Sequence, residues 1–134
     1  MFGYIYDCLF KLSDLLAYKV DLGVKIRKVY KAGDKRELAK EALNIDEVLK
    51  RLDAFHDSAF IQWSTECRMF GYENIDGRLG FLKNRLLSAK DRINKYLDGK
   101  IETIEELEKD ILPFDGFDYE IQWNNWIRNV SPSN

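Results

Sequence analysis

Histidine and cysteine, on which many metal sites and nucleophilic active sites depend, are almost absent from this sequence of 134 residues. It has one histidine, His56, and two cysteines, Cys8 and Cys67, which lie far apart in the chain. That set makes neither a zinc site nor a disulfide framework, so we expect free, buried thiols in a reducing compartment. We expect no metal ion and no cofactor.

The short motifs that mark many enzymes are missing as well. The sequence has no glycine-rich phosphate loop and no His-Glu-x-x-His motif. Cys67 follows His56 by eleven residues, about three turns of a helix, so the two cannot form a nucleophile pair. His56 falls on an apolar helix seam, where we expect a core histidine that is hydrogen-bonded to a neighbour. We therefore predict no catalytic residue in this chain.

An excess of one charge and long apolar runs are also lacking. The chain has 21 lysines and arginines against 23 aspartates and glutamates, interspersed along its length. Without a basic stripe or a run of about 20 apolar residues, we expect no nucleic-acid and no membrane partner. The apolar N-terminus lacks the basic region of a signal peptide, so a cytoplasmic location is expected. Its periodic pattern begins without a helix cap, which suggests a piece of a longer protein and leaves open whether Met1 is native.

Apolar and aromatic residues are plentiful, at 46% and 13% of the chain, beside 33% charged residues. This balance is typical of a globular protein, and the length suits one domain. The apolar residues recur mostly at helical spacing. The sequence therefore predicts an all-α fold: a bundle of about five helices, three long and two short, over residues 1–113. An aromatic-rich C-terminal tail, residues 114–134, is expected to pack on the bundle or on a partner.

The first half of the chain predicts three helices. One long helix covers residues 2–30, with Gly23 tolerated inside it and Gly33 ending it. Asp34 caps a short second helix, and Asn44 caps a long third helix that runs to residue 70. The predicted inner face of the first helix is Ile5, Leu9, Leu12, Leu16, Val20 and Val24. That of the third helix is Ile45, Leu49, Leu52, His56, Ala59, Trp63 and Phe70.

The second half begins with a loop over residues 71–76 and then carries the most regular heptad of the chain. Apolar residues recur at spacings of 4 and 3, which predicts near-antiparallel packing against the preceding helix at about 20°. Leu82 and Leu86 should lie in the core of that hairpin. Thr103 and Glu106 form a capping box for a short fifth helix, which Pro113 ends. The heptad comprises Ile75, Leu79, Leu82, Leu86, Ala89, Ile93 and Tyr96.

The aromatic tail fits two structures equally well. Phe117, Tyr119, Ile121 and Trp123 alternate with polar residues as in a strand, but a helical spacing of 4, 3 and 4 joins Tyr119 to Val130. Both alternatives stay open. Trp123 and Trp126 are the candidate contact residues of the tail, and we interpret them as packing residues before sugar-stacking ones.

The densest polar cluster lies between residues 63 and 78. Its carboxylates, Glu66, Glu73 and Asp76, would suit an acid/base pair for glycoside chemistry. We favour an ion-pair network that braces a helix hairpin, with Arg68 and Arg78 as partners, because a small bundle offers little room for a substrate pocket. The candidate interface or bracing cluster is Trp63, Glu66, Arg68, Tyr72, Glu73, Asp76 and Arg78.

Several stretches resemble the C-terminal helical domain of bacterial glycoside hydrolase family 20 enzymes. These are exo-acting β-N-acetylhexosaminidases, typified by streptococcal N-acetylglucosaminidases. The resemblance covers nearly the whole chain and rests on scattered words rather than one diagnostic motif. The stretches are Val20 to Arg27, Tyr30 to Asp34, Trp63 to Phe70, Ile75 to Leu87 and Ile104 to Glu108.

The resemblance implies a parent protein with a catalytic (β/α)₈ barrel, in which an Asp-Glu pair works with the acetamido group of the substrate. No residue of this chain matches that motif, so no catalytic role is carried over. The adjacent Asp46 and Glu47 lie in the first turn of a predicted helix, where acids favour the helix dipole. We expect a non-catalytic accessory domain whose partners are the barrel of the parent chain and a second copy in a homodimer. The alternative is an independent helical interaction module unrelated to sugars.

Overall fold

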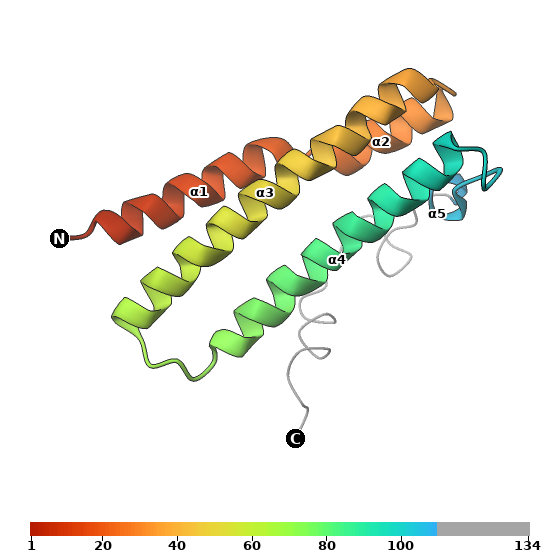
Figure 1. The fold of residues 1–134 in the computed structure, drawn as a ribbon. Helices are drawn as coiled ribbons and strands as arrows, with labels where there is room; N and C mark the ends of the chain where they lie inside the picture. Colours follow the sequence, from red (N-terminus) through yellow and green to blue (C-terminus); the bar gives the residue numbers. More distant parts are fainter. Residues whose placement is uncertain (110–134) are drawn as a thin grey trace, which may run out of the picture.

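The computed structural model describes residues 1–109, which contain five α-helices and no strand (Figure 1). This confirms the all-α class, with three long helices and two short ones, although several bounds differ from those predicted. Residues 110–134, which include Pro113 and the aromatic tail, lie outside the described part. The helices are α1 (Gly3–Lys19), α2 (Leu22–Lys31), α3 (Lys35–Glu66), α4 (Tyr72–Leu97) and α5 (Glu105–Glu108).

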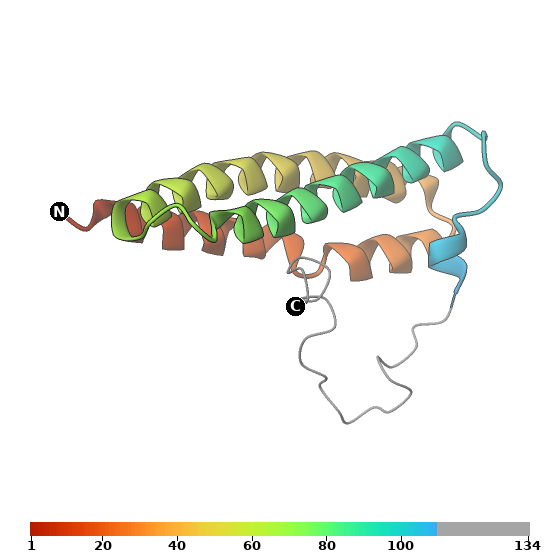
Figure 2. The same ribbon diagram turned by 90° about the horizontal axis from the view of Figure 1, so that it is seen from below.

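The central element of this arrangement is α3. It contacts α1, α2 and α4, whereas α1 and α4 do not contact each other within the described residues. Figure 2 shows α3 and α4 as one layer and α1 and α2, placed end to end, as the other. The short helix α5 follows the end of α4 and packs against α2. Each helix therefore has one covered side and a wide open one.

The core lies where α2, the first half of α3 and the last turns of α4 meet. Buried positions on α3 recur at spacings of 3 and 4, which places them on one face of the helix. The buried core residues are Leu15, Leu22, Ile26, Tyr30, Leu38, Ala42, Ile45, Val48, Leu52, Ile93 and Ile104. No described helix is long and apolar enough to cross a membrane.

The predicted helix over residues 2–30 is two helices, because the chain turns at Val20 and Asp21. Asp21 holds the N-cap position of α2, where aspartate is favoured over a helix interior. Its carbonyl accepts from the backbone N–H of Lys25, and its carboxylate pairs with the Lys25 ammonium at 2.7 Å. The Asp21 side chain makes no capping hydrogen bond, and the break lies at Val20 and Asp21 rather than at Gly23, which is inside α2.

The predicted inner face of the first helix is also wrong in part. Leu9 is 55% exposed and Val20 is 72% exposed, whereas Cys8 and Leu15 are buried against α3. The apolar arc of α1 is wider than one neighbouring helix can cover, and only one edge of it meets α3. Ile5 and Leu12 are half-buried, while Leu16 and Val24 are exposed with Leu9 and Val20.

The predicted division at Asn44 does not exist, since α3 is continuous over 32 residues. The Asn44 amide donates to the side chain of Glu41 at 3.0 Å and stays on the surface. Asparagine inside a helix costs less than about 1 kcal/mol, which the burial of Ala42 and Ile45 on either side outweighs. The predicted cap at Asp34 is confirmed, because its carboxylate accepts from the Glu37 N–H at 3.0 Å.

Two expectations for the second half need correction. The heptad of α4 faces α3, but only Ile93 of it is buried, and Leu82 and Leu86 are half-buried. Their other side is open because α1 does not reach α4. The capping box also fails: Ile104, not Thr103, holds the N-cap position of α5, and no side chain caps it. The loop lies earlier than predicted, over residues 67–71 rather than 71–76, since α3 ends at Glu66 and α4 begins at Tyr72.

Replacing Ile45 by alanine should lower the free energy of unfolding by about 2–5 kcal/mol, because its side chain has no exposed surface. Leu43 provides a matched control on the same helix, where it is 65% exposed. Leu43→Ala should change stability by less than about 0.5 kcal/mol. Chemical denaturation measures both, and equal losses at the two positions would show that this face of α3 is not the core.

Candidate functional site

The turn between α3 and α4 is held by side chains of the cluster singled out in the sequence. The Trp63 indole N–H donates to the carbonyl of Arg68 at 2.8 Å. Gly71 has φ = 95°, a left-handed conformation that favours glycine, and the Trp63 ring lies 3.6 Å from where its Cβ would be. Glu73 accepts from the Gly71 N–H at 2.8 Å. Trp63 and Glu73 together fix the path of the turn.

Tyr72 lies at the centre of this end of the molecule and is buried. Its hydroxyl donates to the carbonyl of His56 at 3.2 Å, and its ring is stacked parallel to the His56 ring with centroids 6.2 Å apart. Phe60 meets the Tyr72 ring edge-on at 5.4 Å, and Trp63 lies at 6.0 Å. Burial raises the pKa of Tyr72, with a smaller contribution from the carboxylate of Asp76. Tyr72 therefore packs between α3 and α4, with its ring against aromatic neighbours and its hydroxyl bonded to α3.

A surface pocket of about 410 Å³ lies beside Tyr72. Within it His56 Nε2 and Asp76 Oδ1 are 2.6 Å apart, which joins α3 to α4. An imidazole paired with a carboxylate can hold a proton, but no serine, threonine, cysteine or lysine lines the pocket as a nucleophile. The arrangement suits bracing of the hairpin. The lining residues are His56, Asp57, Phe60, Ile61, Tyr72 and Asp76.

The three carboxylates of the cluster have separate partners. Asp76 is hydrogen-bonded to His56, Glu73 to the Gly71 N–H, and Glu66 to the amide of Gln62 at 3.3 Å. Burial and the nearby Glu66 carboxylate raise the pKa of Tyr4. Each of the three carboxylates thus bonds to a different group of the hairpin.

The two arginines of the cluster hold different places. Arg68 contributes its carbonyl to the turn, and within residues 1–109 its guanidinium makes no ion pair with these acids. Arg78 lies exposed on α4. His56 and the aromatic rings of Tyr72, Phe60 and Trp63 brace the two helices.

Sequence reasoning missed Phe60 and was wrong about the burial of His56 and Cys67. Phe60 was not singled out, although its position four residues after His56 and three before Trp63 puts all three on one helix face. His56 is hydrogen-bonded as expected, but its side chain is 37% exposed rather than part of the core. Cys8 is buried, which raises the pKa of its thiol, whereas Cys67 is exposed against expectation. No group of residues suited to a metal ion occurs among residues 1–109.

A second set of contacts ties α5 across the other end of the molecule. The Arg27 guanidinium donates to the carbonyls of Glu106, Leu107 and Lys109 at 3.1, 3.1 and 2.7 Å. The Tyr30 hydroxyl donates to Glu108 at 2.5 Å and accepts from the N–H of Ile104 at 3.0 Å. We call residues 104–109 the strap. Arg27 satisfies carbonyls at the C-terminal end of α5 that lack helical partners.

The strap is also tied to α4. Glu106 forms an ion pair with Arg92, and a longer one with Arg85 at 3.7 Å. The hydrogen bond from Arg92 lowers the pKa of Glu106 below its usual range. Residues 104–109 thus join the ends of α2 and α4. Because Arg27 lies about 80 residues before the strap, local sequence patterns could not predict this contact.

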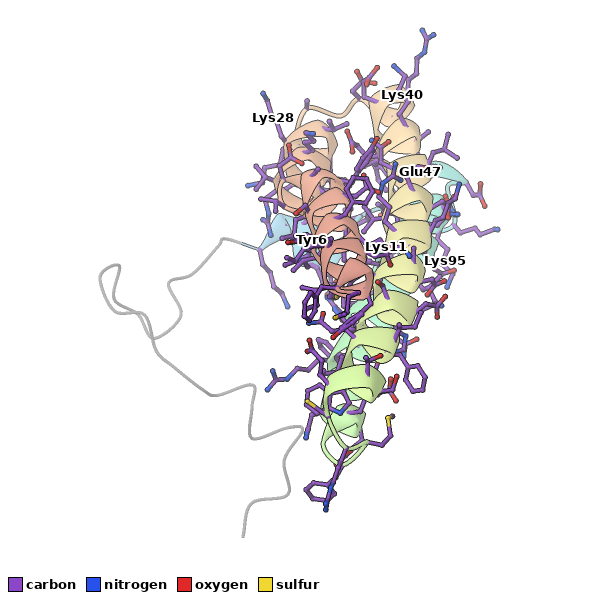
Figure 3. The ribbon with its side chains drawn as sticks, turned by 90° about the vertical axis from the view of Figure 1, so that its left-hand side faces the viewer. Tyr6, Lys11, Lys28, Lys40, Glu47 and Lys95 are labelled. Carbon is purple, nitrogen blue, oxygen red and sulfur yellow. The ribbon has the colours of Figure 1, made fainter. Side chains whose placement is uncertain are left out.

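The third feature is an apolar surface that nothing covers within the described residues. Several large apolar side chains on α1, on α2 or at their ends are exposed, and we call six of them the α1 stripe. Figure 3 views the molecule from the side that α1 faces, with Tyr6 and Lys11 on opposite sides of that helix. The α1 stripe comprises Phe2, Tyr6, Leu9, Leu16, Val20 and Val24.

A model of one known family covers nearly the whole chain. The family is the glycoside hydrolase 20C C-terminal domain, and its model matches residues 1–125 of this chain. The chain belongs to this family. No curated protein matches the sequence. The resemblance noted in the sequence is therefore confirmed at the level of the glycoside hydrolase 20 C-terminal domain.

In this C-terminal domain the adjacent Asp46 and Glu47 are surface ion-pair partners. Asp46 accepts from Lys90 of α4 at 2.5 and 2.6 Å. Glu47 accepts from Arg51 one turn on at 2.6 Å, which lowers the pKa of the Glu47 carboxyl. Asp46 thus forms an ion pair between α3 and α4, and Glu47 forms one within α3. Trp123 and Trp126, the candidate tail contacts, lie outside the described residues.

The ion pair of Glu106 predicts a pH-dependent part of stability. Because the folded-state pKa of Glu106 is lowered, its stabilisation is present at neutral pH and lost as the pH falls below about 4, through the lowered pKa. Glu106→Gln should lower the thermal midpoint modestly at pH 7 and have little effect at pH 3. Glu102→Gln, which removes an exposed acid from the preceding loop, is the control. A gap between Glu106→Gln and wild type that stays constant down to pH 3 would contradict this assignment.

Proposed function

We propose that this domain is a non-catalytic accessory domain that supports the catalytic barrel of a glycoside hydrolase family 20 β-N-acetylhexosaminidase. The observation that carries the proposal is the α1 stripe, an apolar surface left open in a domain whose family stands at the C-terminal end of a glycoside hydrolase. Exposed apolar surface of this extent typically marks an interface.

The polar groups of the described residues support the same proposal. The hairpin pocket has an imidazole and carboxylates but no serine, threonine, cysteine or lysine, and His56, Tyr72 and Asp76 are used in contacts between α3 and α4. The three carboxylates of the cluster have three different partners within the hairpin, which supports a bracing role for them. Substrate chemistry is then the task of the barrel, where the family resemblance puts the Asp-Glu pair.

Homodimerisation is the second role that the open surface supports. Phe2, Tyr6, Leu9 and Phe10 are all exposed at the first turns of α1. When the catalytic barrel is absent, these side chains can be removed from water by a second copy, most simply about a two-fold axis. The alternative of an independent helical module is distinguished by the upstream reading frame, which should encode β/α repeats if the proposal holds.

The 134-residue chain alone should not hydrolyse an aryl N-acetylglucosaminide, because the barrel and its Asp-Glu pair are required. The intact polypeptide should hydrolyse it, and deletion of this domain should lower the thermal midpoint of the remainder. The readout is release of the aryl group by each purified protein. Turnover by the 134-residue chain that disappears in Glu66→Gln or Asp76→Asn would show a catalytic site in this domain and refute the proposal.

The 134-residue chain should self-associate weakly, with dimers appearing at high micromolar concentration. Leu9→Glu should shift it toward monomer, since it places a charge in the open apolar face, whereas Leu43→Glu on exposed α3 should not. Replacing Trp123 and Trp126 by serine tests the tail as the contact instead. Sedimentation across a dilution series measures each variant. A clean monomer of the wild-type chain at high micromolar concentration would rule out this association.

A further inference from the structure

The charges of α1 lie on the wrong side for a helix at the surface of a complete protein. Asp14 pairs with Arg51 of α3 at 3.1 Å, and Asp7 accepts from the buried Ser58 hydroxyl at 2.5 Å. Lys11 pairs with Asp7 at 2.9 Å. A helix exposed to water normally turns its apolar side inward and its charges outward. In α1 both aspartates bond to α3 beside the buried Cys8 and Leu15, and a second set of apolar side chains faces out.

The outward side of α1 has a regular pattern of its own. Phe2, Tyr6, Leu9, Ser13, Leu16 and Val20 follow one another at spacings of 4, 3, 4, 3 and 4, and none of them is charged. A heptad of this kind suits packing along another helix at a shallow angle. The pattern therefore indicates a helical partner surface rather than a flexible peptide or a sheet edge.

A groove at the α2 end of the α1 stripe has basic residues in its lining, which favours a partner with acidic residues. It has a volume of about 480 Å³, with Val20, Gly23 and Val24 as its apolar part and Arg27, Lys28 and Lys31 along its rim. Arg27 is used by the strap, whereas Lys28 and Lys31 are exposed, and Figure 3 shows Lys28 projecting from α2. A partner that fills this groove should bring acidic residues to the rim.

We propose that the α1 stripe is the surface on which helices of the catalytic barrel of the same polypeptide pack, with acidic barrel residues facing Lys28 and Lys31. The inference rests on the proposed function and adds the surface and the partner. A (β/α)₈ barrel presents a ring of helices on its outside, which fits the heptad. The stripe begins at Phe2, the end of α1 at which a catalytic domain that precedes this C-terminal domain joins it.

The size of the α1 stripe favours this occupant over a second copy. At 1.5 Å per residue the stripe is roughly 33 Å long, and a width of about 10 Å gives on the order of 300 Å². Each partner in a stable dimer buries about 800 Å². A covalently joined domain is held at an effective concentration in the millimolar range, so a smaller contact suffices. The same contact between separate chains would be weak.

Thiol labelling tests whether Leu9 is covered. Leu9→Cys and the matched control Leu43→Cys are made in the 134-residue chain and in the intact polypeptide, and both positions are exposed here. Maleimide labelling is followed at the peptide that contains each introduced cysteine, over a range of protein concentrations. Position 9 should react at least tenfold more slowly in the intact polypeptide than in the dilute 134-residue chain, at every concentration. Position 43 should react equally in both.

Each other result overturns the inference. Equal rates at position 9 would show that nothing covers the stripe, and slow labelling in the dilute 134-residue chain would show that the chain covers its own stripe. Slow labelling only at high concentration would identify a second copy. Hydrolysis of an aryl N-acetylglucosaminide by the intact polypeptide is measured in parallel. Activity with an open position 9 refutes this inference alone, whereas protection at position 9 without activity refutes the proposed function alone.

Discussion

The packing of this domain depends on one face of α3. Ile45 and Val48, fully buried on that face, are surrounded by α1, α2 and the end of α4, and these helices scarcely touch one another. The helical bundle is therefore built around α3, and α1 and α4 do not meet within the described residues. The open side of α1 and the half-buried heptad of α4 follow directly from this arrangement.

The two ends of α3 are secured in different ways. At its start, the strap of α5 joins α2 and α4 through Arg27, Tyr30 and Glu106, so the core there is closed by hydrogen bonds to backbone groups. At its end, Tyr72 and Trp63 pack in the hairpin turn, and the His56–Asp76 pair links α3 to α4. Between these two points α1 packs along α3 through the buried Cys8 and Leu15, one ion pair from Asp14 to Arg51 and a hydrogen bond from Ser58 to Asp7.

Much of the fold could be predicted from the sequence, since helical period, the Asp34 cap and the glycine-containing turns are local signals. The predictions that were wrong concern positions where contacts between helices, rather than local sequence, determine the structure. Asn44 resembles a cap, but burial of Ala42 and Ile45 on either side keeps the helix continuous. Thr103 and Glu106 match a capping box, but Glu106 pairs with Arg92 of α4 instead. The inward face of α1 was misjudged because its apolar arc serves two surfaces, and periodicity cannot tell which of them lies inside the domain.

The candidate site was predicted only in part. Trp63, Tyr72 and Asp76 were recognised as a cluster because they are close in sequence, whereas His56 and Phe60 join them only through the hairpin. The most direct test of the account is calorimetry of the intact polypeptide, because an interface along α1 should couple the unfolding of this domain to that of the barrel. We expect one cooperative transition. Two transitions, one of them at the midpoint of the 134-residue chain alone, would contradict the account.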